Sequence, residues 1–113
     1  GAKLRGVDMQ TMADISTAGS VYAPAPCSGS LVRAYVCTQS AITAANCTWT
    51  MEINGVAVTG TGTLLVASAA VGQVSEVIFS APVFVNKGDT IEWISGGESS
   101  TTTIAVFAAV LRT

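Results

Sequence analysis

Two glutamates are the residues of this sequence best suited to catalytic chemistry. Glu52 and Glu92 each lie at a polar position of a segment in which apolar and polar residues alternate. A glycoside hydrolase needs two carboxyl groups held at a fixed separation in a cleft. The alternation has a simpler explanation, because the polar positions of a half-buried strand face solvent. We therefore interpret Glu52 and Glu92 as parts of a solvated sheet face, and a glycan hydrolase built on them stays a minor alternative.

Other catalytic and metal-binding arrangements find little support. The sequence contains no histidine, which excludes Ser-His-Asp and Cys-His mechanisms and every metal site that needs imidazole. Asp89 and Glu98 lie near glycines in expected loops and could offer oxygen ligands to calcium, but they are not clustered as in a calcium loop. The glycines at 60–62 and 96–97 are not followed by a helix, so they form no phosphate cradle. We expect no catalytic residues, no metal and no cofactor.

The three cysteines, Cys27, Cys37 and Cys47, lie ten residues apart. This interval matches no zinc-ligand spacing. Small buried thiols in a reducing compartment are the expected state. A disulfide is the alternative, and Cys37 with Cys47 is the first pair to test because we expect them on neighbouring strands.

The aromatic residues divide into two groups. Trp49 and Trp93 fall on the apolar positions of their strands, which predicts two core residues in place of a sugar-stacking platform. Tyr22 and Tyr35 are better candidates for exposed contacts.

Length and charge limit the class of protein. A chain of 113 residues suits one domain. Only 11% of the residues are charged, against about 25% in an ordinary soluble domain. This shortage predicts that some surface is buried against other copies or a partner. The five cationic residues are scattered, so nucleic acid is not expected as a partner. No apolar run reaches the length of about 18 residues that a membrane span needs, and no signal peptide is recognisable.

From residue 19 onward the sequence is typical of strands and turns. The segment 47–53 alternates strictly and leads into Asn54-Gly55, which predicts a β-hairpin with a type I′ turn that returns through 56–59. Lys87-Gly88-Asp89 predicts a second tight turn, and small residues at 68–72 predict a bend. The remaining expected strands are 19–23, 30–38, 62–67, 73–80, 81–85, 90–94 and 101–111.

Two of these strands raise the question of what covers their second face. In 30–38 we expect Val32, Ala34 and Val36 on one side, with Leu31 and its alternating neighbours on the other. The run 104–111 contains no polar residue. Such a run predicts coverage on both faces, one by the core of the domain and the other by a subunit.

Residues 1–18 have no strict period of two and are interpreted as an N-terminal arm. Met9, Met12 and Ile15 have spacings that one or two helical turns could use, although so short a segment is marginal without packing. A frayed terminus and an arm that docks on a neighbouring subunit remain alternatives. The fold prediction is therefore an all-β chain, with the arm at 1–18 followed at 19–113 by a single β-sandwich of seven to eight antiparallel strands, jelly-roll-like in its connections.

Three segments, 20–35, 53–60 and 85–91, resemble a group of small proteins of tailed bacteriophages. The first reads Ser-Val-Tyr-Ala-Pro-Ala-Pro-Cys-Ser-Gly-Ser-Leu-Val-Arg-Ala-Tyr, the second Ile-Asn-Gly-Val-Ala-Val-Thr-Gly and the third Val-Asn-Lys-Gly-Asp-Thr-Ile. The group comprises head decoration (cement) proteins and related head-fibre or tail-fibre modules. The resemblance implies a structural virion protein that is assembled in the host cytoplasm and binds the outside of the major capsid protein shell as a homo-oligomer, with a trimer favoured. It brings no catalytic residues.

The function expected from residues and resemblance together is a capsid decoration subunit, with no nucleic acid or membrane as partner. A carbohydrate- or receptor-binding fibre tip that uses Tyr22, Tyr35 or loop 96–100 is the alternative. The candidate residues for contact with the capsid or another subunit are Leu4, Arg5, Val7, Met9, Met12, Ile15, Tyr22, Tyr35, Phe107 and Leu111.

Overall fold

The computed structural model describes residues 3–68, 72–81 and 83–113. Within these ranges the chain forms eleven short strands and one 3₁₀ turn, η1. The strands are β1 Leu4–Gly6, β2 Gln10–Met12, β3 Gly19–Pro24, β4 Gly29–Thr38, β5 Cys47–Ile53, β6 Val56–Ala57, β7 Gly62–Leu64, β8 Val74–Ile78, β9 Phe84–Val85, β10 Thr90–Ser95 and β11 Ala105–Arg112.

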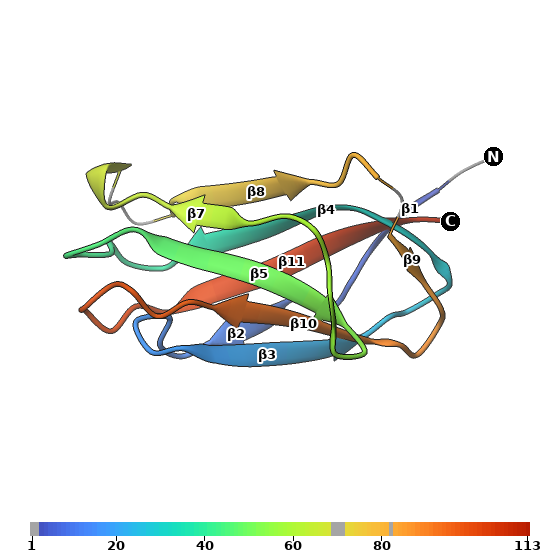
Figure 1. Cartoon of the computed structure of the whole chain (residues 1–113), viewed down its shortest axis with the longest axis horizontal. Coiled ribbons are helices and arrows are strands. Elements are labelled where there is room, and N and C mark those ends of the chain that lie inside the picture. The colour runs from blue at the N-terminus through green and yellow to red at the C-terminus, as the bar shows by residue number, and fades with distance from the viewer. Residues whose placement is uncertain (1–2, 69–71, 82) are drawn as a thin grey trace.

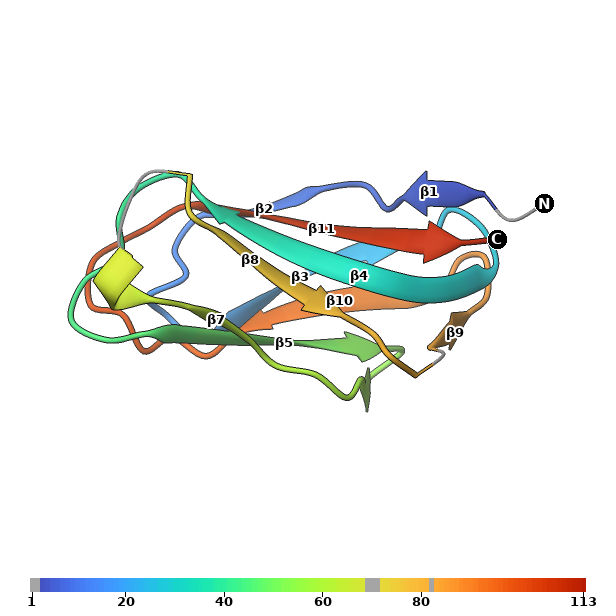
Figure 2. The ribbon, with the colours of Figure 1, turned by 90° about the horizontal axis from the view of Figure 1, so that it is seen from above.

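The strands form two antiparallel sheets that lie as separate layers (Figures 1 and 2). Sheet A has the order β1-β11-β4-β8, with β2 also paired to β11 and β9 also paired to β4. Sheet B has the order β3-β10-β5-β6, with β7 also paired to β5. β1 and the C-terminus lie at the same end of the molecule as β9 (Figure 1). The predicted all-β architecture of two packed antiparallel sheets is confirmed.

Local turn chemistry determines the two tight turns. Asn54 and Gly55 have φ values of 52° and 80°, the two positive angles that a type I′ turn requires, so the predicted hairpin of β5 with β6 is confirmed. Gly88 has a φ of 88° in the predicted turn before β10. There Asp89 closes the turn twice, through its N–H to the Asn86 carbonyl at 2.9 Å and through its carboxylate, which accepts from the Asn86 N–H at 2.7 Å.

The segment between β7 and β9 differs in detail from the prediction. The expected strand 62–67 ends at Leu64 and continues as η1, Val66–Ser68. The expected strands 73–80 and 81–85 shorten to β8 and β9. The bend expected over 68–72 falls largely on 69–71, which lie outside the described residues.

Two tryptophans form the centre of the core, as their positions predicted. Trp49 on β5 is 2% exposed and Trp93 on β10 is 0% exposed. Both belong to sheet B, and both indole N–H groups donate to sheet A. Trp49 Nε1 donates to the Ser75 hydroxyl of β8 at 2.9 Å, and Trp93 Nε1 donates to the Ala108 carbonyl of β11 at 3.3 Å. The indoles therefore join the two layers with polar contacts inside an apolar core.

The N-terminal residues are part of the sandwich. β1 and β2 pair with β11 of the same chain, and Val7, Met12 and Ile15 are all buried in the core. This corrects the expectation of an arm that frays or docks on a neighbouring subunit. The physical reason is that these three apolar side chains cover the core beside β11, while the backbone satisfies the hydrogen bonds of its open edge.

A β-bulge corrects the expected faces of β4. Val110 pairs with Arg33 and the next residue, Leu111, pairs with Leu31, so Val32 is passed over in the register. An extra residue reverses the alternation at that point. Leu31 is consequently buried together with Ala34 and Val36, while Val32 is only half-buried.

The three cysteines are free thiols. Cys37 lies on β4 of sheet A, and Cys47 lies on β5 of sheet B. The expectation that these two occupy neighbouring strands is therefore wrong, because the chain crosses from one sheet to the other between them. Cys47 is buried, in keeping with the interpretation of a small apolar side chain.

The contact between Gly62 and Trp49 gives a stability prediction. A Cβ added at Gly62 would lie 2.1 Å from the Trp49 ring, whereas a Cβ at Gly6 would meet nothing within 4 Å. We expect Gly62→Ala to lower the free energy of unfolding by about 2 kcal/mol or more, as overpacked cores do. Gly6→Ala is the matched control and should change it little. Urea denaturation followed by circular dichroism measures both, and equal stability of the two variants would contradict the prediction.

Candidate functional site

The two candidate catalytic glutamates lie side by side on the outer face of sheet B. Glu52 and Glu92 are direct register partners on β5 and β10, and Tyr22 on β3 is the partner of Glu92 on its other side. Partners in an antiparallel pair project to the same face. Ser20 donates its hydroxyl to Glu92 at 2.5 Å. We call this surface the B face: Ser20, Tyr22, Thr50, Glu52, Glu92 and Ile94.

The B face has the chemistry of a polar contact surface. Both glutamates are half-buried and Tyr22 is 57% exposed. Neither glutamate lines the pocket described below. Two carboxylates beside an exposed aromatic ring can accept hydrogen bonds from hydroxyl groups while the ring supplies an apolar platform.

Within the described ranges, no group of three or more His, Cys, Asp or Glu residues is placed to hold a metal ion. Asp89 closes the turn before β10 through its two hydrogen bonds with Asn86. Hydrogen bonds from the Asn86 backbone and then from the Asn54 side chain hold the pKa of Asp89 below its ordinary value. Its charge is thus used for local structure.

Loop 96–100, a candidate for ligand contacts, is tied to β5 by Glu98. The Thr48 N–H donates to Glu98 Oε2 at 3.0 Å, and the Thr48 hydroxyl donates to Glu98 Oε1. Burial acts to raise the pKa of Glu98, but hydrogen bonds, those from Thr48 foremost, leave the pKa below its ordinary value. The carboxylate is therefore engaged in holding the loop.

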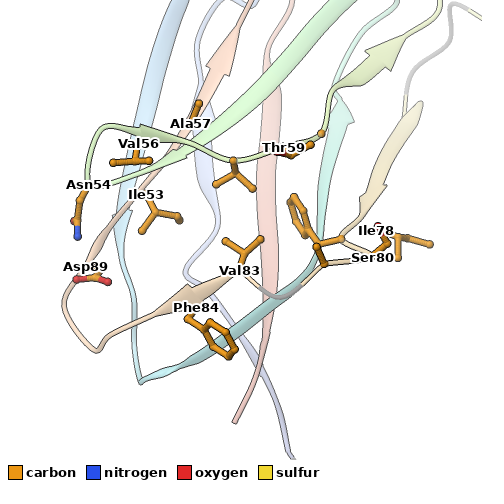
Figure 3. Close-up of a pocket in the computed structure, with 14 residues that line it drawn as sticks. Ile53, Asn54, Val56, Ala57, Thr59, Ile78, Ser80, Val83, Phe84 and Asp89 are labelled. Carbon is orange, nitrogen blue, oxygen red and sulfur yellow. The ribbon is translucent and has the colours of Figure 1, made fainter.

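A groove of about 650 Å³ lies at the other end of the sandwich, near β6 and β9 (Figure 3). One side comes from the β5–β6 hairpin and the chain after it, and the other from the end of β8 and the chain into β9. We call it the end groove. Its lining residues are mostly apolar: Ile53, Asn54, Val56, Ala57, Val58, Thr59, Gly60, Ile78, Phe79, Ser80, Ala81, Val83, Phe84 and Asp89.

Three large apolar side chains of the end groove face solvent. Val56 is 69% exposed, Ile78 is 62% exposed and Phe84 is 79% exposed. Asn54 and Asp89 lie together at one end of the groove (Figure 3), and among the described lining residues only Asp89 is charged. Ile78 pairs with Arg33 and Phe84 precedes the buried Val85, so both side chains project from the outer side of sheet A beside the groove. Exposed apolar groups around a concave site mark a contact surface for an apolar partner.

The outer face of sheet A is a second apolar surface. Its residues follow from the pairing of β8, β4 and β11, in which alternate rows of three register partners project outward and the rows between them face the core. We call it the A face, and its three rows are Val74, Cys37 and Val106; Glu76, Tyr35 and Ala108; and Ile78, Arg33 and Val110. Arg33 and Glu76 form an ion pair at 3.5 Å.

The ten residues predicted to make contacts fall into two groups. Leu4 and Met9 are 63% and 69% exposed, Arg5 and Tyr22 are also exposed, and Tyr35 is half-buried on the A face. The other five are buried in the core of their own chain and need correction as surface candidates, because they fill the sandwich: Val7, Met12, Ile15, Phe107 and Leu111.

Sequence reasoning missed the end groove. Its most exposed side chains, Val56, Ile78 and Phe84, come from three separate segments that only the packing of the two sheets brings together. The sequence did contain one signal: large apolar residues, such as Val56 and Phe84, lie in segments next to turns, where only short strands can form and little of each side chain is buried.

Comparison with known proteins assigns no relative. A scan against known protein families finds no match, and a search of curated proteins finds none either. Among the residues that the structure describes, no helix has the length and apolar character needed to cross a membrane.

The depressed pKa of Glu98 predicts a pH dependence of stability. A carboxyl whose pKa is lower in the folded state stabilises the fold above its unfolded pKa, about 4.3, and loses this contribution as the pH falls through the folded value. We expect Glu98→Gln to flatten the acid side of the stability–pH profile slightly, because the loop is exposed. Urea midpoints from pH 7 to pH 2.5 measure this. Asp8→Asn is the control at another exposed carboxyl, and a profile unchanged by Glu98→Gln would contradict the prediction.

Proposed function

We propose that this chain is a structural virion protein, a capsid decoration subunit that associates with other copies of itself and binds the outer surface of the major capsid protein shell. The observation that carries the proposal is the end groove, which Ile53, Val58 and Val83 help to line. The exposed side chains of Val56, Ile78 and Phe84 lie around it. Its lining suits protein contact, and the resemblance in the sequence supplies the capsid as partner. The three cysteines are free thiols, which agrees with assembly in the reducing cytoplasm of the host.

The strand order supports a jelly-roll interpretation as part of this proposal. We take β1 with β2, β6 with β7, and β8 with β9 as single interrupted strands, since each pair lies along one neighbour. The chain then has eight strands in two sheets of four, with the sequence orders 1-8-3-6 and 2-7-4-5. Such an order is the arrangement of a jelly roll, a fold common in viral capsid proteins.

The end groove fits an apolar segment of the shell protein that carries a basic residue at one end. Its lining contains no cation among the described residues, and Asp89 at the rim gives a basic group a partner. Each Å² of apolar surface removed from water contributes about 25 cal/mol. Many weak contacts repeated over a shell add through avidity.

The test is co-sedimentation of the purified protein with capsids assembled from the major capsid protein of the same phage. We expect saturable binding by the unchanged chain. Phe84→Asp should weaken it at least tenfold, because a carboxylate beside the groove loses apolar contact with the shell protein and must be desolvated.

Leu65→Asp is the matched control, because Leu65 is 44% exposed and lies outside the groove. This variant should bind as the unchanged protein does. The proposal is contradicted if the unchanged protein stays in the supernatant at every concentration, and the groove is excluded as the attachment site if Phe84→Asp binds normally.

A second candidate function is a carbohydrate-binding fibre tip. The B face favours it, because Tyr22 stands exposed beside Glu92, with Glu52 next along the same row. Sugars bind proteins through aromatic stacking combined with hydrogen bonds to carboxylates, and this row offers both groups.

The fibre-tip function predicts glycan binding that depends on Tyr22. On a glycan array, reproducible binding should disappear in Tyr22→Ala, which removes the stacking ring. Tyr35→Ala, on the opposite sheet, should retain it. Absence of binding to every glycan, or binding that Tyr22→Ala does not affect, would reject this function.

A further inference from the structure

The A face and the B face differ sharply in charge. Among the nine side chains of the A face, one is cationic, one is anionic and the rest are apolar apart from the phenol of Tyr35. The B face carries Glu52 and Glu92 with no cation among its six residues. Two copies meeting through their B faces would bring four carboxylates together, whereas two A faces would bring together equal numbers of opposite charges.

The single charges of the A face lie diagonally. Arg33 and Glu76 occupy adjacent rows on neighbouring strands, and their side chains stay 46% and 36% exposed although they contact each other at 3.5 Å. Both charged groups can therefore still contact an oppositely charged group of another molecule. Tyr35 lies opposite Glu76, and its contact with Arg33 raises the pKa of the guanidinium, which stays fully charged.

We infer that the A face binds the A face of a second copy of this chain across a two-fold axis. A two-fold axis in the plane between the sheets, perpendicular to the line from Arg33 to Glu76, sets each Arg33 over the Glu76 of the partner copy. The two ion pairs then become one network of four alternating charges. The apolar side chains around these charges, among them Val74, Val106 and Val110, pack between the two sheets, which stack as in a sandwich at about 10 Å.

This arrangement deepens the self-association part of the proposed function and rests on that part alone. A two-fold pair satisfies both charges by symmetry. A trimer, which the sequence resemblance favours, needs two different surfaces on each copy, and a single A face does not provide them.

The size of the A face sets the expected affinity. Three strands at about 4.8 Å and three rows at about 6.8 Å cover, with side chains, about 20 Å by about 20 Å, which is about 400 Å² on each copy. Stable interfaces bury about 800 Å² on each partner. The dimer should therefore be weak in solution, with a dissociation constant of about 10 μM or more, and it should strengthen when a shell concentrates the copies.

Sedimentation velocity of the purified full chain from about 1 μM to about 1 mM tests the inference. We expect a reversible monomer–dimer equilibrium. Arg33→Glu and Glu76→Arg should each weaken it at least tenfold, because each variant gives the A face charges of one sign. An equimolar mixture of the two variants should form a heterodimer at least as tight as the unchanged dimer. A role of the ion pair only within one chain would not produce this rescue.

Glu52→Arg on the B face is the matched control and should leave the equilibrium unchanged. Circular dichroism establishes that each variant is folded. If a charge variant does not fold, Val106→Lys provides the second test of the same face, and it too should abolish the dimer. A monomer at all concentrations, a trimer, or a mixture of charge variants that stays monomeric overturns the inference.

Capsid co-sedimentation separates this inference from the proposed function. Phe84→Asp changes the end groove and leaves the A face intact, so it should lose shell binding and keep the dimer. Loss of shell binding by the unchanged protein with a normal dimer would reject the capsid as partner and retain the A face contact. A protein that is monomeric in solution but binds shells would reject the A face contact and retain the capsid as partner.

Discussion

The two indole hydrogen bonds between the sheets are the constraint on which the rest of this structure depends. A buried N–H without an acceptor costs about 1–3 kcal/mol, so Trp49 and Trp93 each need a partner inside the core. Trp49 finds it in Ser75 of β8 and Trp93 in the backbone of β11. These contacts fix the lateral position of one sheet over the other, which stacking of apolar side chains alone leaves less defined. Gly62 completes the arrangement by leaving room for the Trp49 ring.

The end groove follows from this central closure. The indoles of β5 and β10 contact β8 and β11 in the centre of the sandwich. The end of the sandwich near β9 is instead built by β6 and β9, each of two residues. Strands this short present little side-chain surface to one another. Ile78 and Phe84 therefore remain exposed on one side, and Val56 on the other. The same shortness blunts these sheet edges as templates for uncontrolled pairing, so the groove offers side chains more than backbone to a partner.

Local patterns predicted much of the fold, and long-range packing decided the rest. Strict alternation located β5 and placed Trp49 in the core, and the Asn54-Gly55 pair defined its hairpin because few residue pairs adopt two positive φ angles. The bulge at Val32 could not be predicted, since it depends on the register between β4 and β11, which are far apart in the sequence. Val7, Met12 and Ile15 were interpreted as an arm because their spacing matches no regular strand. Their burial follows from the open edge of β11, which the sequence does not reveal.

The low charge of the chain corresponds to apolar surface that remains exposed on sheet A and around the end groove. The C-terminal run was expected to be covered on both faces, and β11 does alternate between buried residues such as Phe107 and half-buried ones such as Val106. Its outer side chains are not buried by the chain itself, so the apolar surface that the composition implied is real, but it lies on one sheet and in one groove. On the opposite sheet, Glu52 and Glu92 of the B face stay half-exposed to solvent. A protein with one apolar face, one acidic face and a groove at its end has three surfaces of different chemistry. Such a division suits a subunit that must contact its own copies, a larger shell and water at the same time.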